Sequence, residues 1–340
     1  FYFFCNLYRK SYSLNDENIN SILICQYHRI GDVFLIAPVL RSLKKRYPQA
    51  HIILLCCQSA EKLSRDLEFA DEVIGVEVPW TNWNWSLIKW IKARSFARHF
   101  RNRDIDIAID FKGDLRNSWF LWHVRSKMSL GYTDTGGSFF YTHPQLSPTG
   151  VHQTERSLRL ISHLGCDSIM LDEKEFNFKD QGAIVFHAGG NDPRRAWPEN
   201  KWIKLAEILS KNHEIAIVKT PETAILIERM KEKEFRVEIF DGDLVQFKNW
   251  LRNQKMLIGN DSMPGHLAAY LGIPAISIFG SQDPKMTCPI GQWITIIKPD
   301  ESCEHKRDHW RLCQKCMGTI DVERVSGAVI KLFSRAQVGE

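Results

Sequence analysis

An acid, a hydroxyl and a histidine stand close together directly after an apolar run. Residues 256–280 read MLIGNDSMPGHLAAYLGIPAISIFG, a pattern that predicts a strand, a polar turn, a helix and a second strand. Ligands of open α/β sheets bind at the carboxyl ends of strands, where helix N-termini offer unpaired N–H groups to anions. Asp261, Ser262 and His266 therefore indicate a binding site. The alternative is that Asp261 and Ser262 only cap the helix and that His266 is an ordinary surface residue.

Two glycines and two arginines follow another apolar run. Residues 183–187 predict a buried strand, after which comes the turn AGGNDPRRAWP. Gly189 and Gly190 let the backbone approach a phosphate closely, and Arg194 and Arg195 supply positive charge to a pyrophosphate. The alternative is an ordinary loop with two solvated arginines. The coincidence of glycine, arginine and a strand end favours the phosphate site.

A carboxylate follows the first predicted strand, at residues 21–27. Asp32 stands beside His28 and Arg29 at the mouth of that strand, directly after Gly31, which permits a tight turn. A carboxylate in this place can accept the proton of a hydroxyl group as the oxygen attacks. It can also cap the helix that follows.

Further charged residues gather at the same rim as this carboxylate. Asp110, Lys112 and Arg116 come at the end of the strand predicted at residues 105–110 or directly after it. Together with Arg29 they are assigned to the binding of an acceptor molecule. The alternative is a charged face that only contacts water.

Strands alternate with helices along the whole chain. In the first half, strands are predicted at 21–27, 51–57, 73–78, 105–110 and 127–132, and helices at 33–47, 80–103 and 153–164. In the second half, strands are predicted at 183–187, 214–219, 237–240, 256–259, 275–279 and 293–297, and helices at 199–210, 221–233 and from 322 onward. This alternation predicts an α/β protein with one doubly wound parallel sheet in each half.

Two segments between these elements lack periodicity. Residues 133–150 are rich in glycine, serine and proline and are expected to form a loop, and residues 166–181 are expected to form a linker. Neither half carries the G-x-G-x-x-G fingerprint, so a dinucleotide-dependent hydride enzyme is disfavoured.

The composition fits a two-domain protein that works in a reducing compartment. The 340 residues suffice for two domains of typical size, and a formal net charge of +5 modestly favours anionic partners. No nucleic-acid-binding motif is recognised, so no nucleic acid is expected as a partner. Nine scattered cysteines fit the cytoplasm. The apolar opening segment is too short, and charged residues follow it too early, for a signal peptide. No later apolar run is long enough to span a membrane, so a soluble, cytoplasmic protein is expected.

Residues 80–103 combine aromatic and basic side chains. Four tryptophans, among them Trp83 and Trp85, are joined by six basic residues between Lys89 and Arg103, with no acid among the latter. Such a helix can lie on an anionic membrane surface. The alternative is a helix that covers the sheet and exposes a solvated basic face.

A cysteine-rich segment precedes the last helix. It contains Cys303, His305, His309, Cys313 and Cys316, with Cys288 upstream. Such a set can form a structural zinc or iron site. A cluster without an ion is the alternative, so no residue is assigned as a metal ligand.

Four segments carry a resemblance to a known family. HRIGDVFLIAPVLRSLKKRYP, AIDFKGDLRNS, FHAGGNDPRRAWPENKW and GNDSMPGHLAAYLGIPAISIFG resemble, in order and spacing, the motifs of glycosyltransferase family 9, the bacterial lipopolysaccharide core heptosyltransferases. The resemblance implies a GT-B fold, in which two Rossmann-like domains face a central cleft. The expected parts are an acceptor-binding domain at 1–165, a linker at 166–181, a nucleotide-sugar-binding domain at 182–320 and a helix at 321–340 that packs back on the first domain.

The resemblance also implies a reaction and the roles of its residues. Family members move a heptose from ADP-heptose to a sugar hydroxyl of the lipopolysaccharide inner core, with inversion and without a metal, so no cofactor is expected. By the same resemblance Asp32 is the general base, Arg195 binds the donor phosphate where better-known members often have lysine, and Glu222 is the candidate for a ribose hydroxyl. The other residues assigned to the nucleotide sugar are Gly189, Gly190, Asp261, Ser262, Gly265 and His266.

One position departs from the family pattern. The family usually reads Asp-Ser/Thr-Gly-Pro-x-His, whereas here Met263 stands at the glycine position and Gly265 follows two residues later. Gly265 is the candidate that restores room for a close approach of the donor.

Two other functions remain open at this point. The chain could transfer heptose to a protein hydroxyl, with the cysteine-rich segment as a metal-binding loop. It could also be a non-catalytic module that binds a nucleotide sugar or a membrane. The expected partners of the preferred function are a nucleotide-sugar donor, a lipopolysaccharide core acceptor and, in one interpretation of residues 80–103, the anionic inner face of the cytoplasmic membrane.

Overall fold

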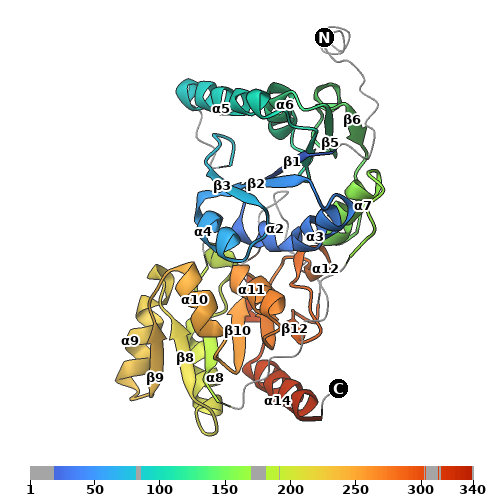
Figure 1. Ribbon diagram of the computed structural model, residues 1–340. Helices are drawn as coiled ribbons and strands as arrows, with labels where there is room; N and C mark the ends of the chain where they lie inside the picture. Colours follow the sequence, from blue (N-terminus) through green and yellow to red (C-terminus); the bar gives the residue numbers. More distant parts are fainter. Residues whose placement is uncertain are drawn as a thin grey trace. The chain divides into compact units, whose positions relative to one another are not determined.

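The chain divides into two compact units, residues 1–170 and 171–340, and each contains one parallel sheet (Figure 1). The computed structural model describes residues 19–81, 86–169, 181–190, 192–301, 303, 313 and 315–338. The division falls within the segment expected as a linker, of which residues 170–180 lie outside the described part.

The sheet of the first unit is parallel throughout. Its strands are β1 (Ser21–Gln26), β2 (His51–Cys57), β3 (Glu72–Val76), β4 (Ile107–Asp110), β5 (Met128–Tyr132) and β6 (His143–Gln145). Their order across the sheet is β3-β2-β1-β4-β5-β6. The order reverses between β1 and β4, which pair in a register that places Cys25 beside Asp110. In such sheets the ligand crevice lies at the reversal, beyond the carboxyl ends of these two strands.

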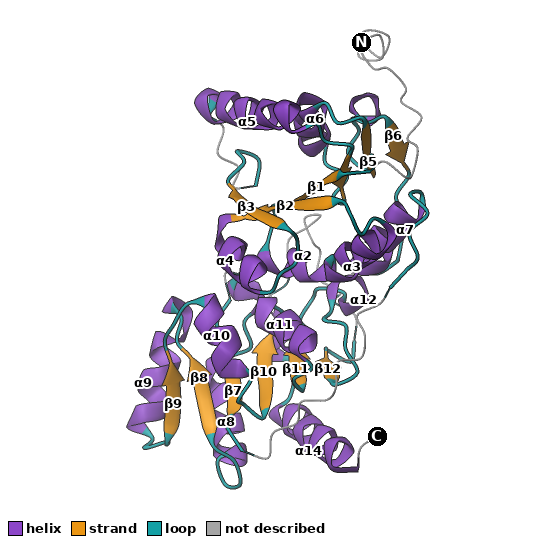
Figure 2. Ribbon diagram, viewed as in Figure 1, coloured by secondary structure: helices purple, strands orange, loops and turns teal. Residues whose placement is uncertain are grey.

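Helices cover both faces of this sheet (Figure 2). They are α2 (Ile30–Leu35), α3 (Ala37–Arg46), α4 (Gln58–Asp66), α5 (Leu87–His99), α6 (Leu115–Val124) and α7 (Gln153–Ser162), with 3-10 turns at Phe100–Arg103 and Ser138–Phe140. α5 and α6 pack together on one face, and α2, α3, α4 and α7 lie on the other. On the first face, Leu23, Ile53 and Ala108 join Ala97 and Phe120 in one core, as the two-residue period of strands requires.

Two predictions for the first unit are wrong. The helix expected over 33–47 is broken at Ile36 into α2 and α3, because Pro38 stands in the first turn of α3, where a missing N–H costs nothing. The loop expected over 133–150 contains β6, an edge strand that pairs Pro144 with Gly131. A proline is tolerated in an edge strand although it reads as a breaker in the sequence.

The second unit repeats the same topology. Its strands are β7 (Ile184–His187), β8 (Ile215–Val218), β9 (Val237–Phe240), β10 (Met256–Asn260), β11 (Ala275–Ile278) and β12 (Ile294–Ile297). They lie in the order β12-β11-β10-β7-β8-β9, with every pairing parallel. The reversal falls between β7 and β10, where Gly259 stands beside His187. Two doubly wound parallel sheets, predicted from the alternation of strands and helices, are therefore confirmed.

The helices of the second unit also lie on two faces of its sheet. They are α8 (Glu199–Leu209), α9 (Ala224–Glu232), α10 (Leu244–Leu251), α11 (Met263–Leu271), α12 (Pro284–Thr287), α13 (Lys315–Gly318) and α14 (Val322–Val338), with 3-10 turns at Pro193–Arg195 and Pro221–Thr223. α8, α9 and α14 share a core with the strands, to which Phe186, Trp202, Ile258 and Val325 belong. α11 packs on β10 and β11.

Two helices of this unit, α14 and α10, can be compared with what the sequence predicted. The C-terminal helix α14 packs against α8 and β12 within the second unit. The sequence reading missed α10, although Asp243 caps it and Gln246 completes a capping box, a pattern visible in the sequence. No helix in the described ranges combines the length and apolar composition needed to cross a bilayer.

Candidate active site

The residues with the strongest predicted roles gather at the reversal point of each sheet. In the first unit Asp32 comes after β1 and Lys112 after β4, and in the second unit Arg195 comes after β7 and Asp261 after β10. Because the two strands at each reversal are neighbours, the side chains beyond their carboxyl ends come together. In each unit they form an ion pair.

Asp32 is held as a carboxylate by Lys112. The Nζ atom of Lys112 lies 2.8 Å from Oδ2 of Asp32, whose side chain is 14% exposed in the first turn of α2. Burial acts to raise the pKa of Asp32, but the charge and hydrogen bond of Lys112, with a smaller contribution from Arg29, hold this pKa below its usual range. Asp32 is therefore ionised near neutral pH, the state in which it can accept a proton.

His28 is a neutral neighbour of this ion pair. Its ring stacks on Tyr27 with 5.6 Å between the ring centroids. Burial lowers the pKa of His28 to about 4, and the charge of Lys112 adds to the effect. Within the described residues, the buried atoms Nδ1 of His28 and Oε1 of Gln26 have no hydrogen-bond partner. Such atoms are rare in folded proteins, and a bound molecule is one way to complete their hydrogen bonds.

Asp110 has no surface with which to contact an acceptor, so its predicted role is wrong. Its side chain is 0% exposed and accepts hydrogen bonds of 2.8–3.2 Å from the main-chain N–H groups of Lys112 and Gly113, the amide of Asn117 and the hydroxyl of Tyr141. These bonds fix the turn after β4. Asp110 therefore positions the lysine that holds the candidate base.

The cationic residues predicted to bind an acceptor differ in how far a neighbouring carboxylate already compensates their charge. Lys112 is paired with Asp32, and the guanidinium of Arg116 donates from Nε to Oδ1 of Asp114 at 2.8 Å. A charge that already faces a carboxylate attracts a phosphate less strongly. Arg29, the N-cap residue of α2, is exposed to solvent. Acceptor binding by these three residues stays a prediction, for which Arg29 offers the most accessible charge.

Arg195 and Asp261 form the corresponding pair in the second unit. Nη1 of Arg195 lies 2.9 Å from Oδ2 of Asp261, and Nη2 lies 3.4 Å from Oε1 of Gln282. In the part of the chain that the structure describes, the buried Nε of Arg195 has no partner, so one donor remains for a phosphate oxygen. The side chain of Asp261 is only 5% exposed. Its carboxylate positions Arg195, and the predicted direct contact with a nucleotide sugar is not supported.

Asn260 ties together the segments around Arg195. Its side chain is 1% exposed, accepts from the N–H of Trp197 at 3.0 Å and donates to the carbonyl of Ala188 at 2.7 Å. The loop after β7 and the segment after the turn Pro193–Arg195 are thereby fixed to the end of β10. From the sequence, Asn260 was expected to end the strand and to help cap the next helix, and this structural role was missed although an amide that ends a buried strand is a visible signal.

The two glycines of the predicted phosphate loop differ. A Cβ atom on Gly189 would lie 2.4 Å from Oγ1 of Thr220, whereas one on Gly190 would meet nothing within 4 Å. Glu222 lies exposed in the turn Pro221–Thr223, directly after β8. Gly189 is thus required by packing, Gly190 leaves open space, and the ribose contact of Glu222 stays a prediction.

A histidine lies at the start of the phosphate loop. His187 is the last residue of β7, and burial lowers its pKa to about 4, while the nearby charge of Glu222 acts in the opposite direction. The imidazole is therefore neutral at physiological pH and can serve the site as a hydrogen-bonding group without adding charge.

The start of α11 differs from the predicted arrangement. Ser262 is the N-cap residue, but its hydroxyl donates to the carbonyl of Asn260 at 3.1 Å, so the alternative that its side chain caps the helix is not supported. The first turn of α11 lacks a side-chain cap, but it offers few N–H groups to an anion, because Pro264 has none and the N–H of Gly265 donates to the carbonyl of Ser262 at 3.3 Å. A Cβ atom on Gly265 would lie 2.5 Å from Oγ of Ser277, so this glycine serves helix packing rather than room for a donor. His266 is 8% exposed.

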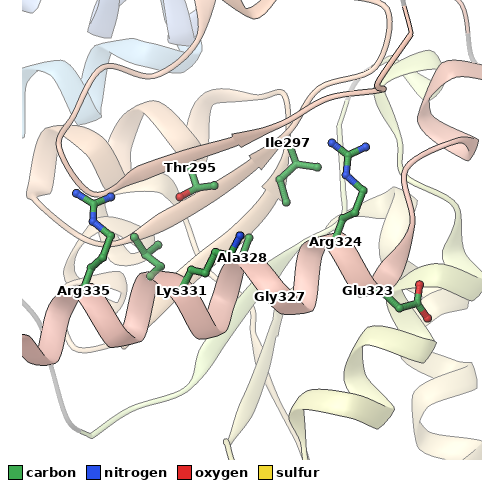
Figure 3. A pocket seen from close by; sticks show the side chains of 9 residues that line it. Thr295, Ile297, Glu323, Arg324, Gly327, Ala328, Lys331 and Arg335 are labelled. Atoms are coloured by element: carbon green, nitrogen blue, oxygen red, sulfur yellow. The ribbon is translucent and has the colours of Figure 1, made fainter.

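A groove of about 480 Å³ lies elsewhere in the second unit, between α14 and β12 (Figure 3). Arg324 and Arg335 lie near its two ends, with Lys331 between them. Arg324 is paired with Asp300 at 3.1 Å, and Arg335 lies over the ring of Trp293 with 5.4 Å to its centroid. None of the predicted site residues lines this groove, so it is not assigned to the reaction.

Sequence and structure comparisons agree on the class of protein. The profile of glycosyltransferase family 9 (heptosyltransferase) matches residues 93–316. Lipopolysaccharide heptosyltransferase 1 of Pseudomonas aeruginosa is 22% identical over 303 residues, which cover 83% of this chain and 84% of that protein. Lipopolysaccharide heptosyltransferase 3 of Escherichia coli is 23% identical and covers 74% of this chain and 81% of its own length.

Solved structures share the fold over nearly the whole chain. Escherichia coli heptosyltransferase WaaC with ADP superposes with a TM-score of 0.74 at 18% identity, and the match covers 92% of this chain and 99% of WaaC. Escherichia coli ADP-heptose lipopolysaccharide heptosyltransferase II gives a TM-score of 0.72 at 15% identity, over 93% of this chain and 99% of that chain. The two Rossmann-like units are therefore those of a GT-B glycosyltransferase. The chain belongs to glycosyltransferase family 9, the heptosyltransferase family.

The role of Asn260 in holding the second site can be tested by stability. Asn260→Ala leaves the N–H of Trp197 and the carbonyl of Ala188 buried without their partner, so we expect a loss of about 1–3 kcal/mol in the free energy of unfolding. Urea denaturation followed by tryptophan fluorescence measures this loss. The exposed Asn249→Ala in α10 is the control and should change stability by less than about 0.5 kcal/mol. Equal effects of the two substitutions would contradict the role given to Asn260.

Proposed function

We propose that this chain transfers a heptose from ADP-heptose to a sugar hydroxyl of the lipopolysaccharide inner core, with inversion at the anomeric carbon. The observation that carries the proposal is the pairing of a charged acid with a cation at both reversal points, Asp32 with Lys112 and Arg195 with Asp261. The names of the relatives, lipopolysaccharide heptosyltransferases 1 and 3, support the choice of substrates.

On the acceptor side, Asp32 is proposed as the general base. The acceptor oxygen attacks the anomeric carbon while its proton passes to the carboxylate of Asp32, and the bond from that carbon to the phosphate oxygen breaks with its electron pair going to ADP. A single displacement of this kind inverts the configuration. The pairing with Lys112 supports this role because it keeps the largely buried Asp32 ionised, with 14% of its side chain still exposed.

On the donor side, Arg195 and the start of α11 are proposed to stabilise the departing ADP. The diphosphate gains negative charge as the bond breaks, and preformed cationic and N–H donors stabilise that charge. Arg195 brings a guanidinium whose buried Nε has no partner among the described residues, the N–H of Met263 begins α11 without a side-chain cap, and Gly190 leaves space for the phosphate. Glu222 is proposed to contact the ribose.

Transfer is proposed to proceed without a catalytic metal. The sequence contains two Asp-x-Asp triplets, 104–106 and 241–243, of the type that can hold a divalent cation. Asp106 is 2% exposed and accepts two main-chain N–H groups and Lys127, and Asp243 caps α10. Because Asp106 and Asp243 already accept hydrogen bonds within the protein, we propose the cationic side chains of the second unit, and not a metal ion, as the partners of the diphosphate.

The acceptor of this reaction is a glycolipid, so we also propose contact with the anionic cytoplasmic face of the inner membrane. Three large apolar side chains of α5 are exposed, Leu87 at 77%, Ile88 at 66% and Ile91 at 58%. A helix with exposed apolar residues and neighbouring basic residues binds at the boundary between headgroups and acyl chains. The helix expected from residues 80–103 is shorter, since α5 spans Leu87–His99 and a 3-10 turn covers Phe100–Arg103, while Trp83 and Trp85 lie outside the described residues.

Basic residues continue the same surface. Arg94 and Arg98 follow on the exposed side of α5, and with Arg101 and Arg125 they act together on His123, whose pKa burial and these four charges lower to about 4. A cluster of arginines beside exposed apolar side chains complements an anionic lipid surface.

The substrates can be tested in cells. Core oligosaccharide from cells that lack this protein should have lost one heptose when analysed by mass spectrometry. Loss of a hexose instead, or an unchanged core, would contradict the proposed reaction.

The assignment of the base can be tested in vitro. Asp32→Asn should reduce transfer of heptose about 10²- to 10⁴-fold, because the attacking hydroxyl loses its proton acceptor. Binding of ADP, measured by calorimetry, should be unchanged. The exposed Asp167→Asn serves as the control and should transfer at the normal rate. Normal transfer by Asp32→Asn would remove the proposed base, and no transfer by the intact protein would favour a binding module.

The role of Lys112 can be read from the pH dependence of the reaction. A base with a lowered pKa stays active as pH falls until the pH passes that pKa, and Lys112→Met removes the main cause of the lowering. Burial then dominates, so the acid limb of the kcat/KM profile should move to higher pH. The exposed Lys45→Met should leave the profile in place. An unmoved profile in Lys112→Met would show that the ion pair does not set the ionisation of Asp32.

Membrane contact can be tested by sedimentation with vesicles. The protein should bind vesicles that contain phosphatidylglycerol more tightly than vesicles of phosphatidylcholine alone. Arg94→Gln should weaken binding about fivefold, since a basic residue near such a surface is worth about 1 kcal/mol, and Leu87→Ser with Ile91→Ser should weaken it further. Ile225→Ser on α9, where the side chain is 58% exposed, is the control. Equal binding by all variants would exclude α5 as the contact.

A further inference from the structure

Three cysteine side chains converge beside the end of β11, apart from the residues assigned to the reaction. The sulfur atoms of Cys303, Cys313 and Cys316 all lie within 4.8 Å of one another. None of the three is part of a disulfide, and Cys316, in α13, is buried while the other two are partly exposed. We propose that these three residues bind one thiophilic metal ion, Zn²⁺ or Fe²⁺, as thiolates.

The spacing of the sulfur atoms fits a metal better than a disulfide. A metal–thiolate bond of about 2.3 Å in a tetrahedral site places the sulfurs about 3.8 Å apart, so a small closing movement brings all three into range. A disulfide would join two of the sulfurs and leave the third unused. Each of the other two thiols also lies within hydrogen-bonding reach of the Cys316 thiol.

The chemistry of the ligand set selects the class of metal. Thiolates are soft ligands that favour zinc and iron over magnesium or calcium. Cys313 and Cys316 have the C-x-x-C spacing found in such sites. Binding replaces three thiol protons by one ion and releases those protons to solvent. The three thiolates leave the fourth tetrahedral position to a water molecule or a further side chain. His305 and His309 lie outside the described residues.

The position of the cluster gives the ion a structural role. The N–H of Cys313 donates to Oγ of Ser281 at 2.7 Å, and Met317 is 0% exposed. A Cβ atom on Gly280 would lie 2.8 Å from Sδ of Met317, so α13 packs directly on the end of β11. An ion held by the three thiolates fixes Cys313 and α13 to this strand end.

The strand end that the ion would fix also contacts the donor site. Gln282, next to Ser281, lies 3.4 Å from the guanidinium of Arg195. Loss of the ion is therefore expected to raise the KM for the donor, a consequence that rests on the proposed function, whereas metal binding itself does not.

Metal analysis of the full chain tests the proposal. Protein purified under reducing conditions without added chelator should carry about one equivalent of zinc or iron per chain by mass spectrometry of the metals. After removal of the metal, titration with Co²⁺ should give the thiolate-to-cobalt charge-transfer absorption in the near ultraviolet together with d–d bands typical of tetrahedral sites. The metal found in the purified protein distinguishes zinc from iron.

Single substitutions locate the site. Cys303→Ser and Cys313→Ser change partly exposed side chains and should weaken Co²⁺ binding about tenfold or more, because each removes a thiolate ligand. Cys57→Ser, also partly exposed but in the first unit, is the matched control and should bind Co²⁺ as the unmodified protein does. Circular dichroism of each variant establishes that it is folded.

Two results would overturn the proposal. The first is that the unsubstituted protein binds no more zinc, iron or cobalt than the Cys313→Ser variant does. The other is equal loss of binding in Cys57→Ser and Cys313→Ser, which would place the metal elsewhere. Neither result depends on heptose transfer, so a failure of the metal site and a failure of the proposed reaction can be told apart.

Discussion

A carboxylate and a cation meet across the reversal of strand order in both units, Asp32 with Lys112 and Arg195 with Asp261. A single charge at such a partly buried place would lose much of its hydration without compensation, so each charge needs the other. Parallel sheets make the meeting possible because the chain leaves both central strands at the same edge. The same topology therefore yields two charged sites from segments that are far apart in the sequence.

The two units differ in which member of the ion pair has the proposed chemical role. In the first unit the acid is the proposed general base and the lysine supports it, whereas in the second unit the arginine is proposed to stabilise the leaving group and the acid supports it. A buried polar side chain at the last residue of the fourth strand stabilises each arrangement, Asp110 in β4 and Asn260 in β10. Both make hydrogen bonds to the main chain and hold the turns from which the functional side chains extend.

The fold could be predicted from the sequence to a large extent, and the partners of the charged residues could not. Apolar runs alternate with amphipathic ones, so the strands and most helices were placed close to their observed bounds. β6 was missed because Pro144 reads as a breaker, although an edge strand tolerates it. Asp110 was taken for a ligand residue because its type and place at a strand end do not reveal that its side chain points inward. The pairing of Asp32 with Lys112 depends on the parallel register of β1 and β4, which local patterns do not encode.

The ion pair of Asp32 has one further consequence for the kinetics. Both of its members, and the buried aspartate that fixes the lysine, belong to the first unit. The charge on the carboxylate is therefore established by the folding of that unit alone and does not wait for a nucleotide to arrive at the other. An enzyme prepared in this way has no electrostatic reason to require one substrate before the other, so a random order of addition is the natural expectation.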